Sequence, residues 1–175
     1  FLDSDDYWHP SKLKKQCTQL ENKKLNAIGC DWNNKSHFIS IFNKNNTVYN
    51  LPKIFVALKW WPHISTIVIR KSLCQEFRGL DNKFKFADDG DFFLKIAKDY
   101  NLNVLKDSLV TCHAFKRYEF SDGVSSNLIG MNNDEVNTIK KHFQNFLIAK
   151  ILIFWIKIKH YKRILKRYYF LNIHK

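Results

Sequence analysis

The sequence lacks several features that would assign it to a class directly. Its four cysteines, Cys17, Cys30, Cys74 and Cys112, form no C-x-x-C pair. Their scatter therefore indicates reduced thiols in a cytosolic protein, and argues against a disulfide framework or a zinc site. There is no secretory signal peptide and no internal repeat. The first residue is phenylalanine and not methionine, which leads us to expect a part of a longer protein.

Acidic residues are missing from the C-terminal stretch. Residues 140–175 contain ten Lys or Arg and no Asp or Glu, and they supply most of the net charge of +13. Such an excess favours a polyanionic partner, either nucleic acid or an anionic membrane surface. Residues 146–158 are apolar but are interrupted by Lys150 and Lys157, so they are too short and too charged to predict a membrane span.

The next stretch, residues 159–170, alternates basic pairs with tyrosines and aliphatic residues. This pattern is typical of a basic amphipathic helix on a membrane surface. It fits equally a helix that packs on a missing part of the protein or on a partner and exposes a solvated basic face. Both interpretations remain open.

The length of 175 residues is enough for one domain with a real core. Periodicity predicts helices over 10–22, 51–61 and 88–100, a short helix or turn over 71–76, and almost continuous helix from 134. It predicts strands over 25–31, 37–42, 64–70 and 103–113. In the first helix we expect Leu13, Cys17 and Leu20 to form the buried face. The predicted fold class is α/β.

Two acidic clusters are the candidate functional motifs. Phe1-Leu2 reads as the end of a buried strand, and Asp3-Ser4-Asp5-Asp6 follows where the strand leaves the sheet. In open α/β folds ligands bind at that edge, and a hard divalent cation would relieve the repulsion among three carboxylates. The second cluster, Asp88-Asp89-Gly90-Asp91, opens a helix. The alternatives are a solvated turn for the first cluster and helix capping for the second.

The order of these motifs resembles the C-terminal half of family 2 glycosyltransferases, which have the GT-A fold. The motifs that carry the resemblance are Phe1 to Gln16, Ser65 to Arg70, Leu80-Asp81 and Asp88 to Lys95, within residues 1–126. The resemblance implies a partial GT-A, Rossmann-like domain over residues 1–130, without its N-terminal nucleotide-binding half. A helical basic tail over residues 131–175, with basic amphipathic helices, would follow.

The resemblance also implies residue roles. Asp3, Asp5 and Asp6 would bind the nucleotide-sugar, and Asp5 would bind a divalent metal, Mn²⁺ or Mg²⁺, together with His113. Asp89 would be the catalytic base that deprotonates the acceptor hydroxyl.

The implied activity is inverting transfer of a sugar from a nucleotide-diphospho-sugar to a saccharide or lipid-linked acceptor. It would serve bacterial-type surface polysaccharide synthesis at the cytoplasmic face of a membrane. The activity would belong to a longer parent, and we expect this chain alone to be inactive. One alternative is a basic module that binds nucleic acid or membrane, and another is an inactive truncated glycosyltransferase. No nucleic-acid partner is expected, because the front half lacks a basic and aromatic binding face.

Overall fold

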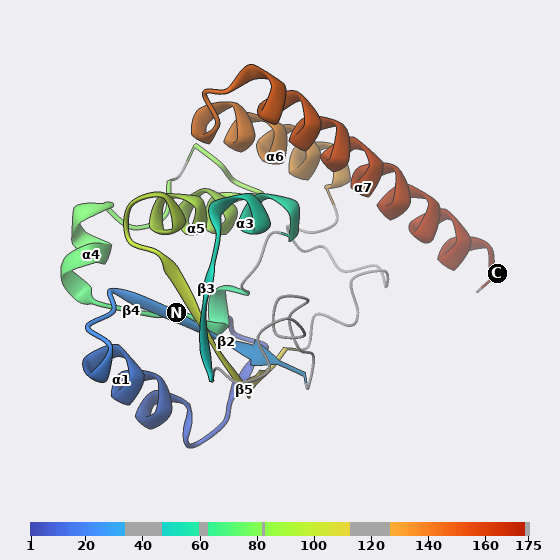
Figure 1. The fold of residues 1–175 in the computed structure, drawn as a ribbon. Coiled ribbons are helices and arrows are strands. Elements are labelled where there is room, and N and C mark those ends of the chain that lie inside the picture. The colour runs from blue at the N-terminus through green and yellow to red at the C-terminus, as the bar shows by residue number, and fades with distance from the viewer. Residues whose placement is uncertain (34–46, 60–62, 82, 113–126, 174–175) are drawn as a thin grey trace.

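The computed structural model describes residues 1–33, 47–59, 63–81, 83–112 and 127–173 (Figure 1). It is a mixed α/β fold in which a five-stranded sheet carries helices on both faces. The α/β class predicted from the sequence is therefore confirmed. The predicted boundary between residues 130 and 131 falls inside a helix that begins at Leu128.

The sheet is built around its longest strand, β5 (Leu102–Thr111). On one side β5 pairs in parallel with β2 (Ala27–Trp32), which pairs antiparallel with the short β4 (Val68–Ile69). On the other side β5 pairs antiparallel with two strands in succession. Its first half contacts β3 (Val48–Leu51), and its last residues contact β1 (Tyr7–Trp8). The carboxyl end of β5 thus lies beside the start of the chain.

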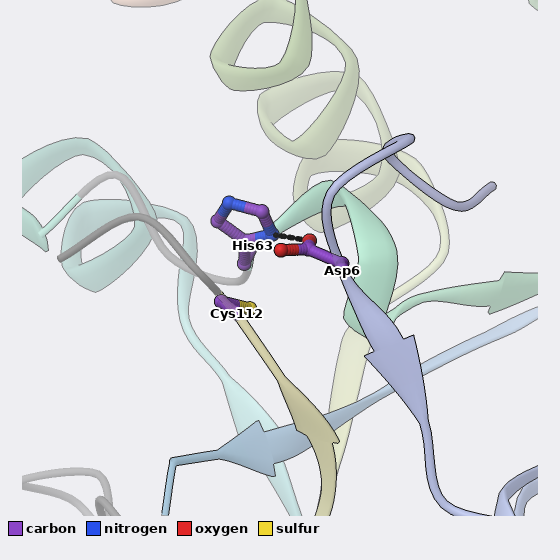
Figure 2. A group of neighbouring side chains, drawn as sticks. All are labelled: Asp6, His63 and Cys112. Atoms are coloured by element: carbon purple, nitrogen blue, oxygen red, sulfur yellow. Dashed lines mark ion pairs between the residues drawn. The ribbon is translucent and has the colours of Figure 1, made fainter. Parts of the chain in front are cut away.

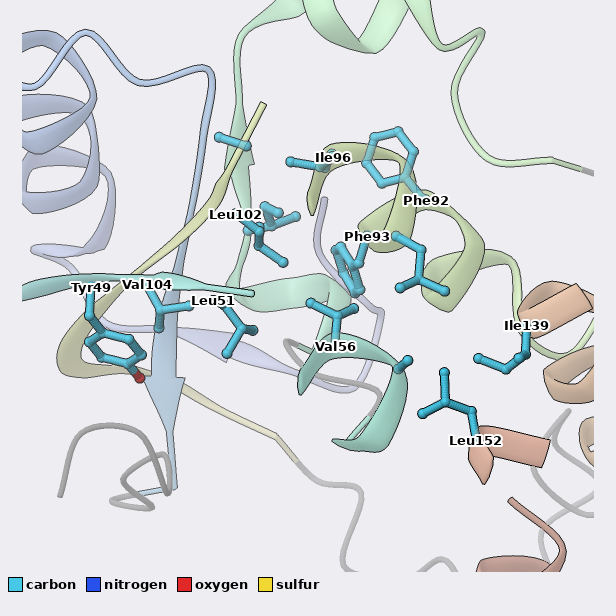
Figure 3. Close-up of a cluster of buried hydrophobic side chains, with 14 of the residues drawn as sticks. Tyr49, Leu51, Val56, Phe92, Phe93, Ile96, Leu102, Val104, Ile139 and Leu152 are labelled. Carbon is cyan, nitrogen blue, oxygen red and sulfur yellow. The ribbon is translucent and has the colours of Figure 1, made fainter. Parts of the chain in front are cut away.

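Two hydrophobic clusters cover the two faces of this sheet. The larger cluster lies between the sheet and the helices α3 (Lys53–Lys59) and α5 (Asp88–Asp99), and it includes Val56, Phe93 and Val104 (Figure 3). The smaller one joins β2 and β5 to α1 (Lys12–Asn22) through Leu20. Val104 and Leu105 belong to different clusters, because successive strand residues point to opposite faces.

A C-terminal helical hairpin forms the outer layer over α3 and α5 (Figure 1). Its helices are α6 (Leu128–His142) and the long α7 (Phe146–Ile173). Ile139, Leu152 and Ile156 carry the larger core cluster into the hairpin. Among the described residues, no helix combines the length and apolarity needed to cross a membrane.

The predicted buried face of α1 is wrong in part. Leu13 and Cys17 are exposed, and the buried residues are Lys12, Gln16 and Leu20. These three are also one turn apart, so they form an equally regular face. Gln16 can be buried because its Nε2 donates hydrogen bonds to the carbonyls of Ile28 and Thr66, both at 2.9 Å.

The predicted strand over 64–70 is also largely wrong. A 3-10 turn, η1 (Ile64–Thr66), occupies its first half, and only Val68–Ile69 is strand. Side chains compete here with sheet pairing. Thr66 Oγ1 donates to the His63 carbonyl at 2.6 Å, and Trp8 Nε1 donates to the Ser65 carbonyl at 2.8 Å.

Apart from the strand end predicted at Phe1-Leu2, which is not a strand, the other predicted elements that can be compared are confirmed. They are α1, β2, α3, α5, β5 and the helical C-terminal region, together with α4 (Lys71–Glu76). Gly79, at φ +71°, follows α4 in the left-handed conformation that its lack of a Cβ allows, and its N–H donates to the Cys74 carbonyl. The strand predicted over 37–42 lies outside the described residues.

Candidate functional site

The N-terminal acidic loop, residues 3–6, differs from the prediction in its surroundings. Phe1 and Leu2 are exposed and are not part of a strand, so the loop precedes the short strand β1. The Asp6 N–H donates to the Asp3 carbonyl at 3.1 Å, which closes a turn. The Asp3 N–H donates to Ser65 Oγ at 3.0 Å. The backbone of this segment therefore bonds within itself and to η1, which leaves no ladder for a strand.

Asp6 points inward and joins two residues from distant parts of the chain (Figure 2). Its Oδ2 lies 3.4 Å from Nδ1 of His63, which precedes η1. Cys112 lies directly after β5, and one ligand-type atom from each of the three residues lies within 4.8 Å of the others. The cluster thus ties the acidic loop to η1 and to the carboxyl end of β5.

The electrostatics of this cluster favour a protonated thiol. Burial and the neighbouring Asp6 carboxylate raise the pKa of Cys112 to about 12. A thiol with that pKa is a poor nucleophile at neutral pH. The cluster therefore serves to hold the acidic loop against the rest of the fold through polar contacts. Its mixed oxygen, nitrogen and sulfur set would suit Zn²⁺ better than the hard cations Mg²⁺ or Mn²⁺.

Asp3 and Asp5 are the carboxylates that the loop leaves exposed. Partial burial raises the pKa of Asp3, and the charges of Asp6, Asp5 and Asp88 raise it further, against an opposing effect of His63. Burial is the largest of these effects, and the neighbouring carboxylates add to it. Asp3 and Asp5 offer oxygen donors of the kind that Mg²⁺ or Mn²⁺ binds. Among the described residues, however, the side chains close enough together to hold an ion are those of Asp6, His63 and Cys112.

The second acidic motif opens α5, as the sequence predicts. Asp88, Asp89 and Asp91 all fall in its first turn. Asp88 Oδ1 accepts from the Asp89 N–H at 2.9 Å, and Asp89 Oδ1 accepts from the Gly90 N–H at 2.6 Å. Both side chains thus satisfy N–H groups at the start of α5, and their position suits the helix dipole. Asp88 and Asp89 are half-buried, so solvent reaches part of each side chain.

The fold brings the two acidic motifs to the same region. The charge of Asp88 acts on Asp3, although 85 positions separate them in the sequence. The ring of Phe1 packs edge-on against that of Phe92 in α5, with centroids 5.7 Å apart. Loop and helix start are thus neighbours, held by an aromatic contact beside the carboxylates.

Asp91 differs from Asp88 and Asp89, because solvent does not reach its side chain. It is fully buried and contacts three basic residues, with Lys95 at 3.0 Å, Lys141 at 2.9 Å and His142 at 2.7 Å. Burial alone would raise the pKa of Asp91, but hydrogen bonds from His142, Lys141 and Lys95 outweigh burial and hold it well below its usual range. Because Lys141 and His142 belong to α6, Asp91 joins α5 to the C-terminal hairpin.

The predicted site residues thus have different positions. Asp3, Asp5 and Asp88 lie at one region, and Asp89 follows Asp88 in the first turn of α5, whereas Asp6 faces the interior. His113, predicted as a metal ligand, lies outside the described residues. The roles predicted for Asp3, Asp5, Asp6 and Asp89 stay predictions.

Sequence reasoning gave no role to His63 or Ser65 and treated Cys112 only as a reduced thiol. All four cysteines are indeed free. The one local signal was the position of Cys112 at the end of a predicted strand, where α/β folds place ligands. His63 had no such signal, because it meets Asp6 only after folding.

Comparison of the sequence with protein-family models and with curated proteins finds no match.

Proposed function

We propose that this chain is the C-terminal part of an inverting, metal-dependent glycosyltransferase with a GT-A-like fold. The observation that carries the proposal is that the loop of Asp3 and Asp5 lies beside the start of α5, where Phe1 packs on Phe92 and the charge of Asp88 acts on Asp3. The resemblance to GT-A glycosyltransferases implies two such groups of carboxylates, one for the donor diphosphate and its metal and one for the acceptor. The mixed α/β sheet supports the proposal at the level of fold class.

In this proposal Asp3 and Asp5 hold the donor side. Both are exposed on the loop, and the charge of Asp5 is one of those that raise the pKa of Asp3. A bound Mg²⁺ or Mn²⁺ would neutralise charge on the leaving diphosphate. Asp6 has a positioning role, because its contacts with His63 and Cys112 orient the turn that carries the other two carboxylates.

Asp89 is the proposed catalytic base. It is half-buried in the first turn of α5, where the helix dipole favours a negative charge. An ionised carboxylate can accept the proton of the acceptor hydroxyl as that oxygen attacks the anomeric carbon. Attack opposite the leaving diphosphate inverts the anomeric configuration. The acceptor would be a saccharide or a lipid-linked saccharide in surface polysaccharide synthesis.

The test measures release of nucleoside diphosphate by the longest natural polypeptide that contains this chain. A panel of nucleotide-sugars is offered with Mn²⁺, with Mg²⁺ or with a chelator. Asp89→Asn should lower turnover at least ~100-fold, the usual contribution of general base catalysis. Asp5→Asn should raise the Mn²⁺ concentration required. Asp99→Asn is the matched control, because Asp99 is exposed at the opposite end of α5.

Two results would contradict the proposal. Unchanged turnover in Asp89→Asn would remove the base assignment. The absence of turnover with every donor, together with salt-sensitive binding to RNA or DNA, would favour the alternative of a basic nucleic-acid-binding module.

A further inference from the structure

A stripe of exposed apolar and aromatic side chains runs along α7. Its members follow one another at alternating intervals of four and three residues, and we call them the α7 stripe: Leu147, Ile151, Phe154, Ile158, Tyr161, Leu165 and Tyr168. Alternating intervals of four and three keep residues on one face of a helix. Over this length the stripe extends roughly 30 Å along the helix.

These side chains face solvent. Ile158 is half-buried, and the other six expose between 39% and 67% of their surface. Leu152 and Ile156, on the opposite side of α7, are 1% and 0% exposed. A continuous exposed apolar surface of this size is rare on monomeric proteins and marks a site of interaction.

The stripe cannot turn inward without breaking contacts on the other face. Trp155 Nε1 donates to the Leu58 carbonyl of α3 at 3.0 Å. Arg163 makes two hydrogen bonds, of 2.6 Å and 3.2 Å, with the buried carboxylate of Glu135 in α6. These contacts fix the rotation of α7 about its axis and leave the stripe outward.

The charges beside the stripe select its partner. Lys150 and Lys157 lie on one side of it at helical spacing, and Lys162 and Lys166 lie on the other; all four are exposed. Residues 140–175 contain no Asp or Glu. In a pair of α7 helices from two copies, lysines would face lysines, which is unfavourable. An anionic lipid surface instead suits both the α7 stripe and the lysines beside it, because its interior accepts apolar side chains and its headgroups attract the lysines.

We infer that α7 docks in the plane of an anionic membrane surface, with the α7 stripe in the lipid and the flanking lysines at the headgroups. Docking positions the carboxylates of residues 3–6 and 88–89 on a protein fixed to a membrane. The inference does not depend on glycosyl transfer, because vesicle binding requires no turnover.

The experiment is co-sedimentation of the full chain with vesicles of phosphatidylcholine alone and with 30% phosphatidylglycerol, at low and high salt. Binding should require the anionic lipid and weaken with salt. Ile151→Gln with Phe154→Gln should lower the partition coefficient at least ~10-fold, since two apolar side chains are lost from the lipid. Lys150→Gln with Lys157→Gln should lower it about 25-fold, at about fivefold for each lysine near the surface. All four positions are exposed, so folding should be retained.

Ile129→Gln is the control, because Ile129 is 71% exposed on α6 and lies outside the stripe. It should bind as the wild type does. Loss of binding in the lysine variant but not in the stripe variant would overturn the inference, because charge alone would then explain attachment. Failure to bind anionic vesicles would also overturn it. If sedimentation velocity then showed a dimer that the stripe variant dissociates, a second copy would be the occupant.

Discussion

Lys12 offers the sharpest test of the energetics of this fold. It is the first residue of α1, and its side chain is fully buried. Its Nζ has no hydrogen-bond partner among the described residues. The ammonium lies 4.2 Å from the centroid of the Trp8 ring. Burial lowers the pKa of Lys12 from its usual 10.5 to about 8. Lys12→Met keeps the length of the side chain and removes the charge.

The expected effect follows from the sign of this pKa change. A pKa lowered from 10.5 to about 8 means that burial disfavours the charged form by about 3 kcal/mol. In Lys12→Met, loss of the cation–π contact with Trp8 offsets about 1 kcal/mol of the stability gained by removing the buried charge. Lys12→Met should therefore be more stable than the wild type by about 2 kcal/mol at pH 7. Between pH 8 and 10.5 only the unfolded chain keeps the proton, so wild-type stability rises and the difference shrinks.

The assay is urea unfolding at pH 7 and at pH 10.5, with reducing agent to protect the four free thiols. Lys14→Met is the matched control, because Lys14 is exposed on the same helix. It should change the free energy of unfolding by less than about 0.5 kcal/mol at both pH values. A Lys12→Met variant less stable than the wild type at pH 7, or a difference independent of pH, would refute the reasoning.

Three further changes test other contacts. Asp91→Asn should cost about 1.5–3 kcal/mol, because it removes the charged acceptor of the hydrogen bonds from Lys95, Lys141 and His142. Because the pKa of Asp91 is held well below its usual range in the fold, only the unfolded chain takes up this proton just below pH ~4, so wild-type stability should fall as the pH drops below about 4. Urea unfolding from pH 7 to pH ~2 measures both. Gly130→Ala should destabilise α6 by about 1–3 kcal/mol, against the usual helix preference for alanine, because its Cβ would lie 2.5 Å from the Phe86 ring; thermal unfolding shows the sign. Glu135→Gln should cost about 3 kcal/mol by leaving Arg163 uncompensated, and a double-mutant cycle with Arg163→Met measures the coupling.

The elements that sequence reasoning located correctly have strong local signals. The strand β5 is a long run of strand-forming residues, and α5 begins with three aspartates that suit a helix N-terminus. The predicted strand over 64–70 failed although its β-branched residues favour a strand. Its polar pair, Ser65-Thr66, bonds with side chains from α1 and β1, and such long-range competition cannot be read from local composition.

The buried face of α1 shows a second limit of pattern reasoning. Hydrophobicity favoured Leu13 and Cys17, but the fold buries Lys12 and Gln16. Gln16 is used because its amide bridges the carbonyls of Ile28 and Thr66. An apolar residue at that position would leave those two carbonyls without this donor.

The candidate site likewise has parts that the sequence predicts and parts that only the fold reveals. Both acidic motifs are visible in the sequence because each is contiguous, and the fold brings them together. The cluster of Asp6, His63 and Cys112 was not foreseeable, because its members come from positions more than 100 residues apart. Local spacing therefore located the exposed carboxylates but not the contacts that orient their loop.

Directional contacts also decide which face of α7 is exposed. Apolar residues lie on both of its sides, with Leu152 buried and Phe154 exposed, so hydrophobic burial alone gives little preference for one rotation of the helix. The bonds of Trp155 and Arg163 require one particular rotation, because each needs a specific partner at hydrogen-bond distance. A buried ion pair contributes modest net stability but can specify one arrangement over its competitors. The α7 stripe is thus exposed because polar contacts on the opposite face select that rotation of the helix. Its exposed apolar side chains are then free to enter the membrane surface that we infer.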